Sequence, residues 1–210
     1  MEEQKIFWNG VTYCPFVKST DLDSKYWERD LLTMRKLGIN MIRPFVAWDR
    51  IEQVEGVRDY SALDKIFDLC EKHGIGILLN FGGALPCFGG AYAPRFLVKN
   101  PKVQKIVYDP RVDARQFGPV RTLCQDDPIY HKKVMEFLDD CAKRYCNHPA
   151  LVAWDLWNEA FYKEDGCFCP ITMTKYRNFL KKKYVTLENL NTVLGGEFPT
   201  AYESWDEVEP

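Results

Sequence analysis

The chain has 210 residues, of which 46% are hydrophobic and 28% are charged, and its formal net charge is −2. This composition is typical of a globular domain with a sizeable core. The nearly balanced charge gives no electrostatic basis for binding nucleic acid or an anionic membrane, and we expect neither as a partner. The first residues lack the apolar segment of a signal peptide and no apolar run reaches membrane-spanning length, so we expect a cytoplasmic protein.

Eight cysteines occupy positions 14, 70, 87, 124, 141, 146, 167 and 169. Disulfides are rare in proteins that are not exported, and a chain of this length can be stabilised by its own core. We therefore expect most of these cysteines to be reduced thiols.

Short apolar runs alternate with helical patterns along the chain. In the helical patterns, apolar residues recur three and four positions apart. We expect strands at 7–15, 39–44, 75–80 and 151–157, and helices at 24–37, 61–73, 129–146, 172–184 and 187–194. The sequence Ser61-Ala-Leu-Asp64 has the form of a capping box, which predicts that Ser61 caps the second helix.

Strands that alternate with helices form a parallel sheet. The first expected strand is not followed by a GxGxxG sequence, which disfavours a nucleotide-binding open sheet. A (β/α) barrel of TIM type fits better, and because a complete barrel has about 250 residues, residues 1–210 would form its amino-terminal part with about four β/α units. The long connection 81–127, rich in Gly, Pro and charge, would form a wall over an active site.

The clearest expected strand is Leu151–Trp157. Its residues are apolar on both faces, as in a parallel strand covered by helices on both sides. Asn158 and Glu159 follow it, at the carboxyl end where barrels and parallel sheets bind ligands. A carboxyl group there, beside an amide and near Trp154, suits proton transfer to a sugar oxygen. The alternative is a surface carboxylate that caps the next turn.

Three stretches together resemble glycoside hydrolase family 42 of clan A. They are Ile42–Gly56, with the sequence IRPFVAWDRIEQVEG, Trp154–Glu159, with the sequence WDLWNE, and the tail from Cys167 to Glu207. The likeness covers nearly all 210 residues. Members of this family are mostly retaining β-galactosidases on an eightfold β/α barrel, so the resemblance implies a retaining glycoside hydrolase that cleaves terminal β-galactosides or related β-glycosides and takes a carbohydrate substrate.

The resemblance also implies roles for three residues. Glu159 would be the general acid/base, Asn158 would bind the 2-hydroxyl of the sugar, and Arg43 would position the catalytic groups. A retaining enzyme needs a second carboxylate about 5–5.5 Å from the first, as nucleophile. In the family this residue ends the seventh strand, which would lie beyond residue 210. For Arg43, a purely structural ion pair is the alternative.

Family members carry a zinc site of four cysteines near a trimer interface, so the resemblance implies a homotrimer and a structural zinc. Cys124, Cys167 and Cys169 match three of the four positions, and Thr172 stands at the fourth. Structural zinc sites prefer four protein ligands, so three reduced thiols without metal are the alternative. Catalysis itself would need no cofactor.

Two further interpretations stay open. The family usually has an acidic residue where this chain has Pro44-Phe45-Val46, and a Trp where it has Pro199, so a clan A hydrolase of another β-glycoside, such as a mannoside or glucoside, is one alternative. The other is a non-catalytic half-barrel that binds carbohydrate or assembles with a partner. Its open sheet would have two unpaired edges, which another chain would have to cover.

Overall fold

The computed structural model describes residues 6–16, 23–81, 93–107, 123–156, 158, 167–194 and 201–209. Four strands form one parallel sheet in the order β1-β2-β3-β4. The strands are β1 (Gly10–Thr12), β2 (Met41–Arg43), β3 (Gly76–Asn80) and β4 (Leu151–Asp155). Consecutive strands are neighbours and are joined by helices, which is the arrangement of a partial β/α barrel and confirms the predicted fold class.

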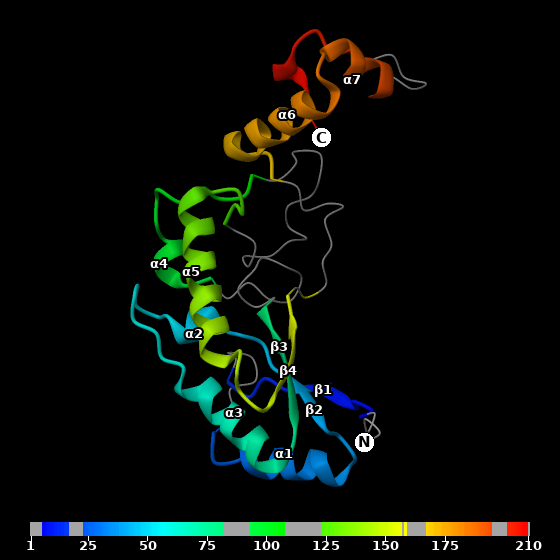
Figure 1. The fold of residues 1–210 in the computed structure, drawn as a ribbon. Coiled ribbons are helices and arrows are strands. Elements are labelled where there is room, and N and C mark those ends of the chain that lie inside the picture. The colour runs from blue at the N-terminus through cyan, green and yellow to red at the C-terminus, as the bar shows by residue number, and fades with distance from the viewer. Residues whose placement is uncertain are drawn as a thin grey trace.

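The helices lie in two groups. Helices α1 (Trp27–Lys36), α3 (Ser61–His73) and α5 (Pro128–Tyr145) lie on one side of the sheet, and the short helices α2 (Trp48–Ile51) and α4 (Arg95–Val98) follow β2 and β3 (Figure 1). Helices α6 (Pro170–Tyr184) and α7 (Leu187–Leu194) lie beyond the carboxyl ends of the strands, with the 3-10 turn Trp205–Glu207. Of the helices in the described ranges, none is both long and apolar enough to cross a bilayer.

The core lies between the sheet and the first group of helices. Ile42, Ile77 and Leu79 of the strands have no exposed surface, and aromatic rings from the helices stack beside them. The ring centroids of Phe67 and Tyr145 lie 4.2 Å apart, which joins α3 to α5. Each large apolar side chain buried in this way contributes about 1.5–3 kcal/mol to the free energy of unfolding.

Strands and long helices lie where the sequence predicts them, with ends that differ by a few residues. The short helices α2 and α4 were not predicted, because a single helical turn leaves too little periodicity to detect. The predicted cap of α3 is wrong. Ser61 is the first helical residue, and its amide N–H donates to Oδ1 of Asp59 at 2.9 Å, so Asp59 provides the local hydrogen bond.

A second expectation is also wrong, since β4 is not buried on both faces. The side chain of Val152 is 39% exposed, and Ala153 is exposed as well. Within the described part of the chain, helices cover only one face of the sheet. On the other face, Gly76 of β3 lies under Trp8 and Val152, where a Cβ atom would meet Val152 Cγ2 at 2.5 Å and Trp8 Cζ3 at 2.7 Å.

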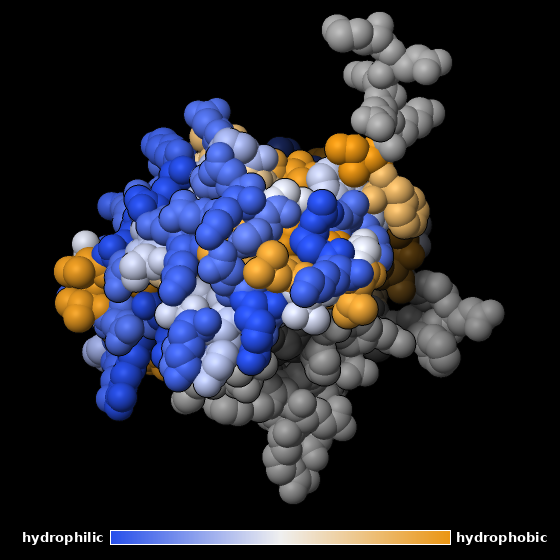
Figure 2. Space-filling model, turned by 90° about the horizontal axis from the view of Figure 1, so that it is seen from below, coloured by the Kyte–Doolittle hydropathy of each residue, from blue (hydrophilic) through white to orange (hydrophobic). Residues whose placement is uncertain are grey.

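The two ends of the sheet differ in character. Figure 2 shows the end opposite α6 and α7, where hydrophilic residues predominate and apolar ones are scattered. The carboxyl ends of the strands point the other way, toward the second group of helices. Parallel β/α folds bind ligands at the carboxyl ends of their strands, so a functional site is expected at this end.

Candidate functional site

Polar side chains end three consecutive strands: Arg43 on β2, Asn80 on β3 and Asp155 on β4. The register pairs Asn80 directly with Asp155, and an isolated bridge pairs Phe45, just after β2, with Asn80. One oxygen of Asp155, Oδ2, accepts hydrogen bonds from Arg43 Nε and from Asn80 Nδ2, each at 2.6 Å. Arg43 Nη2 lies 2.5 Å from the same oxygen. These three residues form the strand-end cluster.

Asn158 joins this cluster through Arg43. The Nη2 group of Arg43 donates to Oδ1 of Asn158 at 3.0 Å, and Asn158 is only 9% exposed. The structure therefore brings together Arg43 and Asn158, two of the predicted site residues. Glu159, the predicted acid/base, lies outside the described residues, as does Trp157.

Aromatic side chains lie on both faces of the sheet at the strand ends. The guanidinium of Arg43 lies over the ring of Phe45, with 5.0 Å between its carbon and the ring centroid. Trp154, which directly precedes Asp155, stacks on Phe81 at 5.0 Å between centroids. Successive strand residues point to opposite faces, so Trp154 and Phe81 pack on the face opposite Asp155 and Asn80, whereas the ring of Phe45 contacts the charged pair itself.

Sequence reasoning missed Asn80 and Asp155. A signal for both was present, since Asn80 ends the third apolar run as Asn158 follows the fourth, and Asp155 is a charge inside an otherwise apolar strand. Asn80 is fully buried, and its Nδ2 group is the end of the amide that bonds Asp155. Its Oδ1 atom has no hydrogen-bond partner among the described residues.

The predicted cysteine site forms a compact cluster near the start of α6. The Sγ atoms of Cys124, Cys167 and Cys169 all lie within 4.8 Å of one another, and those of Cys124 and Cys169 are 3.5 Å apart. The hydroxyl of Thr172 lies 3.2 Å from Cys124 Sγ and 3.5 Å from Cys169 Sγ, so it occupies the fourth corner. No disulfide is formed by any of the seven cysteines in the described ranges.

Local structure holds the thiols of Cys167 and Cys169. Cys169 caps α6, and its sulfur accepts a hydrogen bond from the Thr172 amide at 3.5 Å. The amide of Val107 donates to the sulfur of Cys167 at 3.4 Å. A hydrogen bond from the Cys124 thiol, with further ones from backbone amides, lowers the pKa of Cys167 to about 5, while the same bond and burial raise the pKa of Cys124.

The chemistry of this donor set can be compared with the zinc site that the family resemblance implies. Three close, partly buried thiols, one of them readily ionised, fit the soft ligands that zinc binds. A threonine hydroxyl is not a ligand that structural zinc sites use, so the residues fit a metal ion held by three thiolates with a non-protein fourth ligand. They do not fit a closed four-thiolate site.

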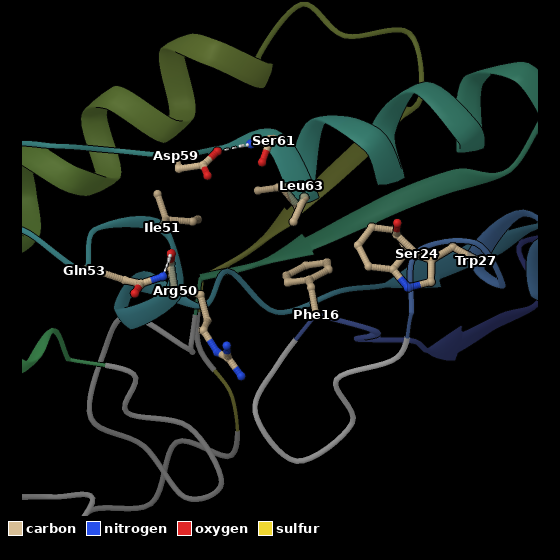
Figure 3. A pocket seen from close by; sticks show the side chains of 10 residues that line it. Phe16, Ser24, Trp27, Arg50, Ile51, Gln53, Asp59, Ser61 and Leu63 are labelled. Carbon is tan, nitrogen blue, oxygen red and sulfur yellow. Dashed lines mark hydrogen bonds between the residues drawn. The ribbon is translucent and has the colours of Figure 1, made fainter.

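A separate cavity of about 350 Å³ lies among α1, α2 and α3 (Figure 3). The rings of Phe16 and Trp27 bound it on one side, and Asp59 and Ser61 lie on another. No member of the strand-end cluster lines it. Its lining includes residues on both sides of the range 17–22, which is not described.

Comparisons with known proteins agree on one family. Residues 13–210 match the family model for glycoside hydrolase family 42, described as beta-galactosidase. The chain is 32% identical over 186 residues to the beta-galactosidase bgaB of Geobacillus kaustophilus, covering 88% of this chain and 26% of that protein. It is 29% identical over 212 residues to the beta-galactosidase LacZ of Heyndrickxia coagulans, covering 99% of this chain and 30% of that protein.

Solved structures give the same result. The beta-galactosidase of the Antarctic haloarchaeon Halorubrum lacusprofundi superposes with a TM-score of 0.77 at 27% identity, covering 97% of this chain and 29% of that one. The beta-galactosidase of Marinomonas ef1 superposes with a TM-score of 0.75 at 27% identity, covering 97% and 30%. The chain therefore spans less than a third of the length of the relatives that it matches.

Proposed function

Because the chain belongs to glycoside hydrolase family 42, we propose that it forms the amino-terminal part of the catalytic barrel of a retaining glycosidase that cleaves terminal β-galactosides or related β-glycosides. Residues 1–210 would contribute the first four β/α units, with 81–127 as a wall of the site. The observation that carries the proposal is the hydrogen bond between Arg43 and Asn158 at the carboxyl ends of β2 and β4. It places two residues with proposed roles in one network, next to the position of Glu159 in the chain.

Asn158 would bind the 2-hydroxyl of the sugar. Arginine has only hydrogen-bond donors, so the bond from Arg43 engages the oxygen of the Asn158 amide. The N–H groups of the amide are then the end that would donate to a sugar hydroxyl. In retaining glycosidases the contact with the 2-hydroxyl strengthens in the transition state, so this orientation would contribute to rate.

Glu159 would be the general acid/base. It would protonate the leaving oxygen in the first step and accept a proton from water in the second, while a nucleophilic carboxylate beyond residue 210 forms the glycosyl-enzyme. The relatives named above are beta-galactosidases, which supports a β-galactoside as substrate. A β-mannoside or β-glucoside is the second candidate, on the departures at Pro44–Val46 and Pro199.

The cysteine cluster would hold a structural metal ion. Cys124, Cys167 and Cys169 would supply three thiolates, and a non-protein ligand would complete the site on the side of the Thr172 hydroxyl. Bound metal would tie the segment before α5 to the start of α6. The hydrolytic reaction needs no cofactor. A homotrimer is proposed on family resemblance alone.

The test of the proposed function is Glu159→Ala in the whole natural protein that carries this sequence. Loss of the acid should slow hydrolysis of a glycoside with a poor leaving group by about 10²–10⁴-fold. An aryl glycoside with a good leaving group should suffer less in its first step, and azide should restore its turnover by replacing water as the acceptor. An unchanged rate on the poor substrate would disprove the role of Glu159.

A non-catalytic half-barrel is the competing function. Its sheet would have unpaired edges at β1 and β4, which have no strand partner in the described ranges and which another chain would have to cover. Activity of the wild-type protein separates the two functions. A sugar-binding module would bind galactosides in a titration and hydrolyse none.

A further inference from the structure

The carboxylate of Asp155, at the end of β4, contacts the side chains that end β2 and β3. We infer that Asp155 is a positioning residue of the site, which sets the geometry of Asn158 through Arg43. The inference rests on the proposed glycosidase function and adds a residue that the reaction scheme above does not use. The contacts that carry the inference are those of the Asp155 carboxylate with Arg43 and Asn80.

Asn80 holds the Asp155 carboxylate from the neighbouring strand. It is fully buried, its backbone amide donates to Pro44 O at 3.0 Å, and its carbonyl accepts from the Val46 amide at 2.9 Å. Its side-chain Nδ2 group reaches Asp155 Oδ2 at 2.6 Å. The carboxylate is therefore anchored from β3 as well as by its own strand.

The anchored carboxylate in turn fixes the guanidinium of Arg43. Both Nε and Nη2 lie within 2.6 Å of Asp155 Oδ2, so one edge of the planar group faces the carboxylate. The Nη2 group on that edge also donates to Asn158 Oδ1. An arginine side chain has several rotatable bonds, and charge-assisted hydrogen bonds restrict it far more than contact with the Phe45 ring can.

Asn80 thus positions the carboxylate of Asp155, the carboxylate positions the guanidinium of Arg43, and the guanidinium orients the amide of Asn158. Asp155 lies 112 positions from Arg43 and 75 from Asn80, so the network joins three strands into one unit. Without the carboxylate, the orientation of the Asn158 amide loses its fixed donor. Displacement of a substrate-binding group by about 1 Å can lower a rate by about 100-fold.

A second arginine–carboxylate pair in the same chain provides the matched control. Glu52 is 2% exposed and accepts hydrogen bonds from Trp48 Nε1 at 2.8 Å and Arg58 Nε at 3.1 Å. Its arginine also pairs with Asp140 of α5 at 3.0 Å. This pair has the same chemistry and is at least as buried, and among the described residues it contacts none with a proposed role at the site.

The experiment compares Asp155→Ala, Asp155→Asn and Glu52→Gln in the whole natural protein, each assayed on an aryl β-galactoside and on its 2-deoxy analogue. For Asp155→Ala we expect kcat on the parent substrate to fall by about 100-fold with little change in KM. The 2-deoxy substrate, which lacks the hydroxyl that Asn158 would bind, should lose less than about fivefold. Asp155→Asn keeps an oxygen acceptor and should lie between Asp155→Ala and the wild type. Glu52→Gln should lower the melting temperature and leave kcat unchanged.

A double variant adds a readout that a merely structural role would not produce. If Asp155 acts through Asn158, then Asp155→Ala combined with Asn158→Ala should be no slower than Asn158→Ala alone. Equal losses on the two substrates, or additive losses in the double variant, would overturn the inference. Should Asp155→Ala fail to fold, Asp155→Asn carries the same comparisons.

Failure of the proposed function would give a different result. If the wild-type protein neither cleaves nor binds a glycoside, the proposed function is wrong. The positioning inference is then decided by crystal structures of the wild type and of Asp155→Asn or Asp155→Ala. A guanidinium of Arg43 that moves out of hydrogen-bond range of Asn158 in the Ala variant supports the inference. One that stays in place overturns it.

Discussion

Asp127 caps α5 and, through Gln104, also contacts the segment that carries Cys124, and Asp127→Ala tests how much these hydrogen bonds stabilise the fold. Asp127 is only 2% exposed. Its Oδ1 atom accepts from the amides of Ile129 and Tyr130, and its Oδ2 atom accepts from the amide of Gln104, all at 2.9 Å. The carbonyl of Gln104 in turn accepts from the amide of Cys124.

The expected loss follows from these three bonds. Removing an N-cap carboxylate costs about 1 kcal/mol in the free energy of unfolding. The third bond, to Gln104, lies outside the helix, and leaving its half-buried donor without an acceptor costs about 1–3 kcal/mol more. We therefore expect Asp127→Ala to lower the free energy of unfolding by about 3 kcal/mol.

Two further variants make the estimate specific. Asp127→Asn keeps the cap, because Asn caps helices as well as Asp does, but its amide N–H groups would face the Gln104 donor, so about 1–2 kcal/mol should be lost. Asp59 bonds the Ser61 amide at 2.9 Å in the same way but is exposed, and water can replace it. Asp59→Ala should therefore cost less than about 0.5 kcal/mol.

The measurement is urea unfolding followed by tryptophan fluorescence, with the differences taken from midpoints and slopes. A loss in Asp127→Ala no larger than in Asp59→Ala would refute the reasoning, since it would mean that the buried bonds are not needed. A similar loss in Asp127→Asn and Asp127→Ala would show that the bond to Gln104, and not the helix cap, is the decisive one.

Two other predictions concern Glu52 and Thr172. Burial alone would raise the pKa of Glu52, but hydrogen bonds from Trp48, Gly56 and Arg58 outweigh it and hold that pKa below its usual value. The ionised carboxylate therefore stabilises the fold above the usual pKa of about 4.3, and this contribution is lost as the pH falls through the lower folded-state pKa. Glu52→Gln should be less stable by about 2–3 kcal/mol at pH 7, and a gap that does not narrow below about pH 4 in denaturation curves would contradict this. Thr172→Cys would complete four thiolates and should tighten cobalt binding, followed by visible absorption, by about tenfold or more. Thr174→Cys on the same helix, whose hydroxyl bonds Pro170 O, is the control and should not change the affinity.

The sequence predicted the order of elements well because periodicity is a local property. Apolar spacing alone located α7 at its observed ends and α5 to within a residue. It failed where a decision depended on a single side chain, as at Ser61, since both Asp59 and Ser61 are good cap formers and only backbone geometry distinguishes them. It also failed for the exposed face of β4, because an apolar run does not specify what covers it.

The candidate site was predicted in part. Strand-end position and family resemblance identified Arg43 and Asn158, which the structure brings together. Asn80 and Asp155 were missed because their roles depend on the register between strands that are far apart in sequence. Each looked unremarkable alone: one polar residue at the end of an apolar run and one charge beside a tryptophan.

The ion pair of Arg43 bears on how its role should be interpreted. A structural ion pair and a positioning role were alternatives for this residue, yet the same guanidinium makes both contacts, to Asp155 and to Asn158. Buried ion pairs seldom add net stability, because the cost of removing two charges from water offsets their attraction. A pair placed at the carboxyl ends of β2 and β4, with side chains about a quarter exposed, is therefore better explained by the orientation it imposes on Asn158 than by its contribution to folding. If so, variants of Asp155 should alter the rate of the proposed reaction by more than their effect on stability predicts, whereas variants of Glu52 should do the reverse.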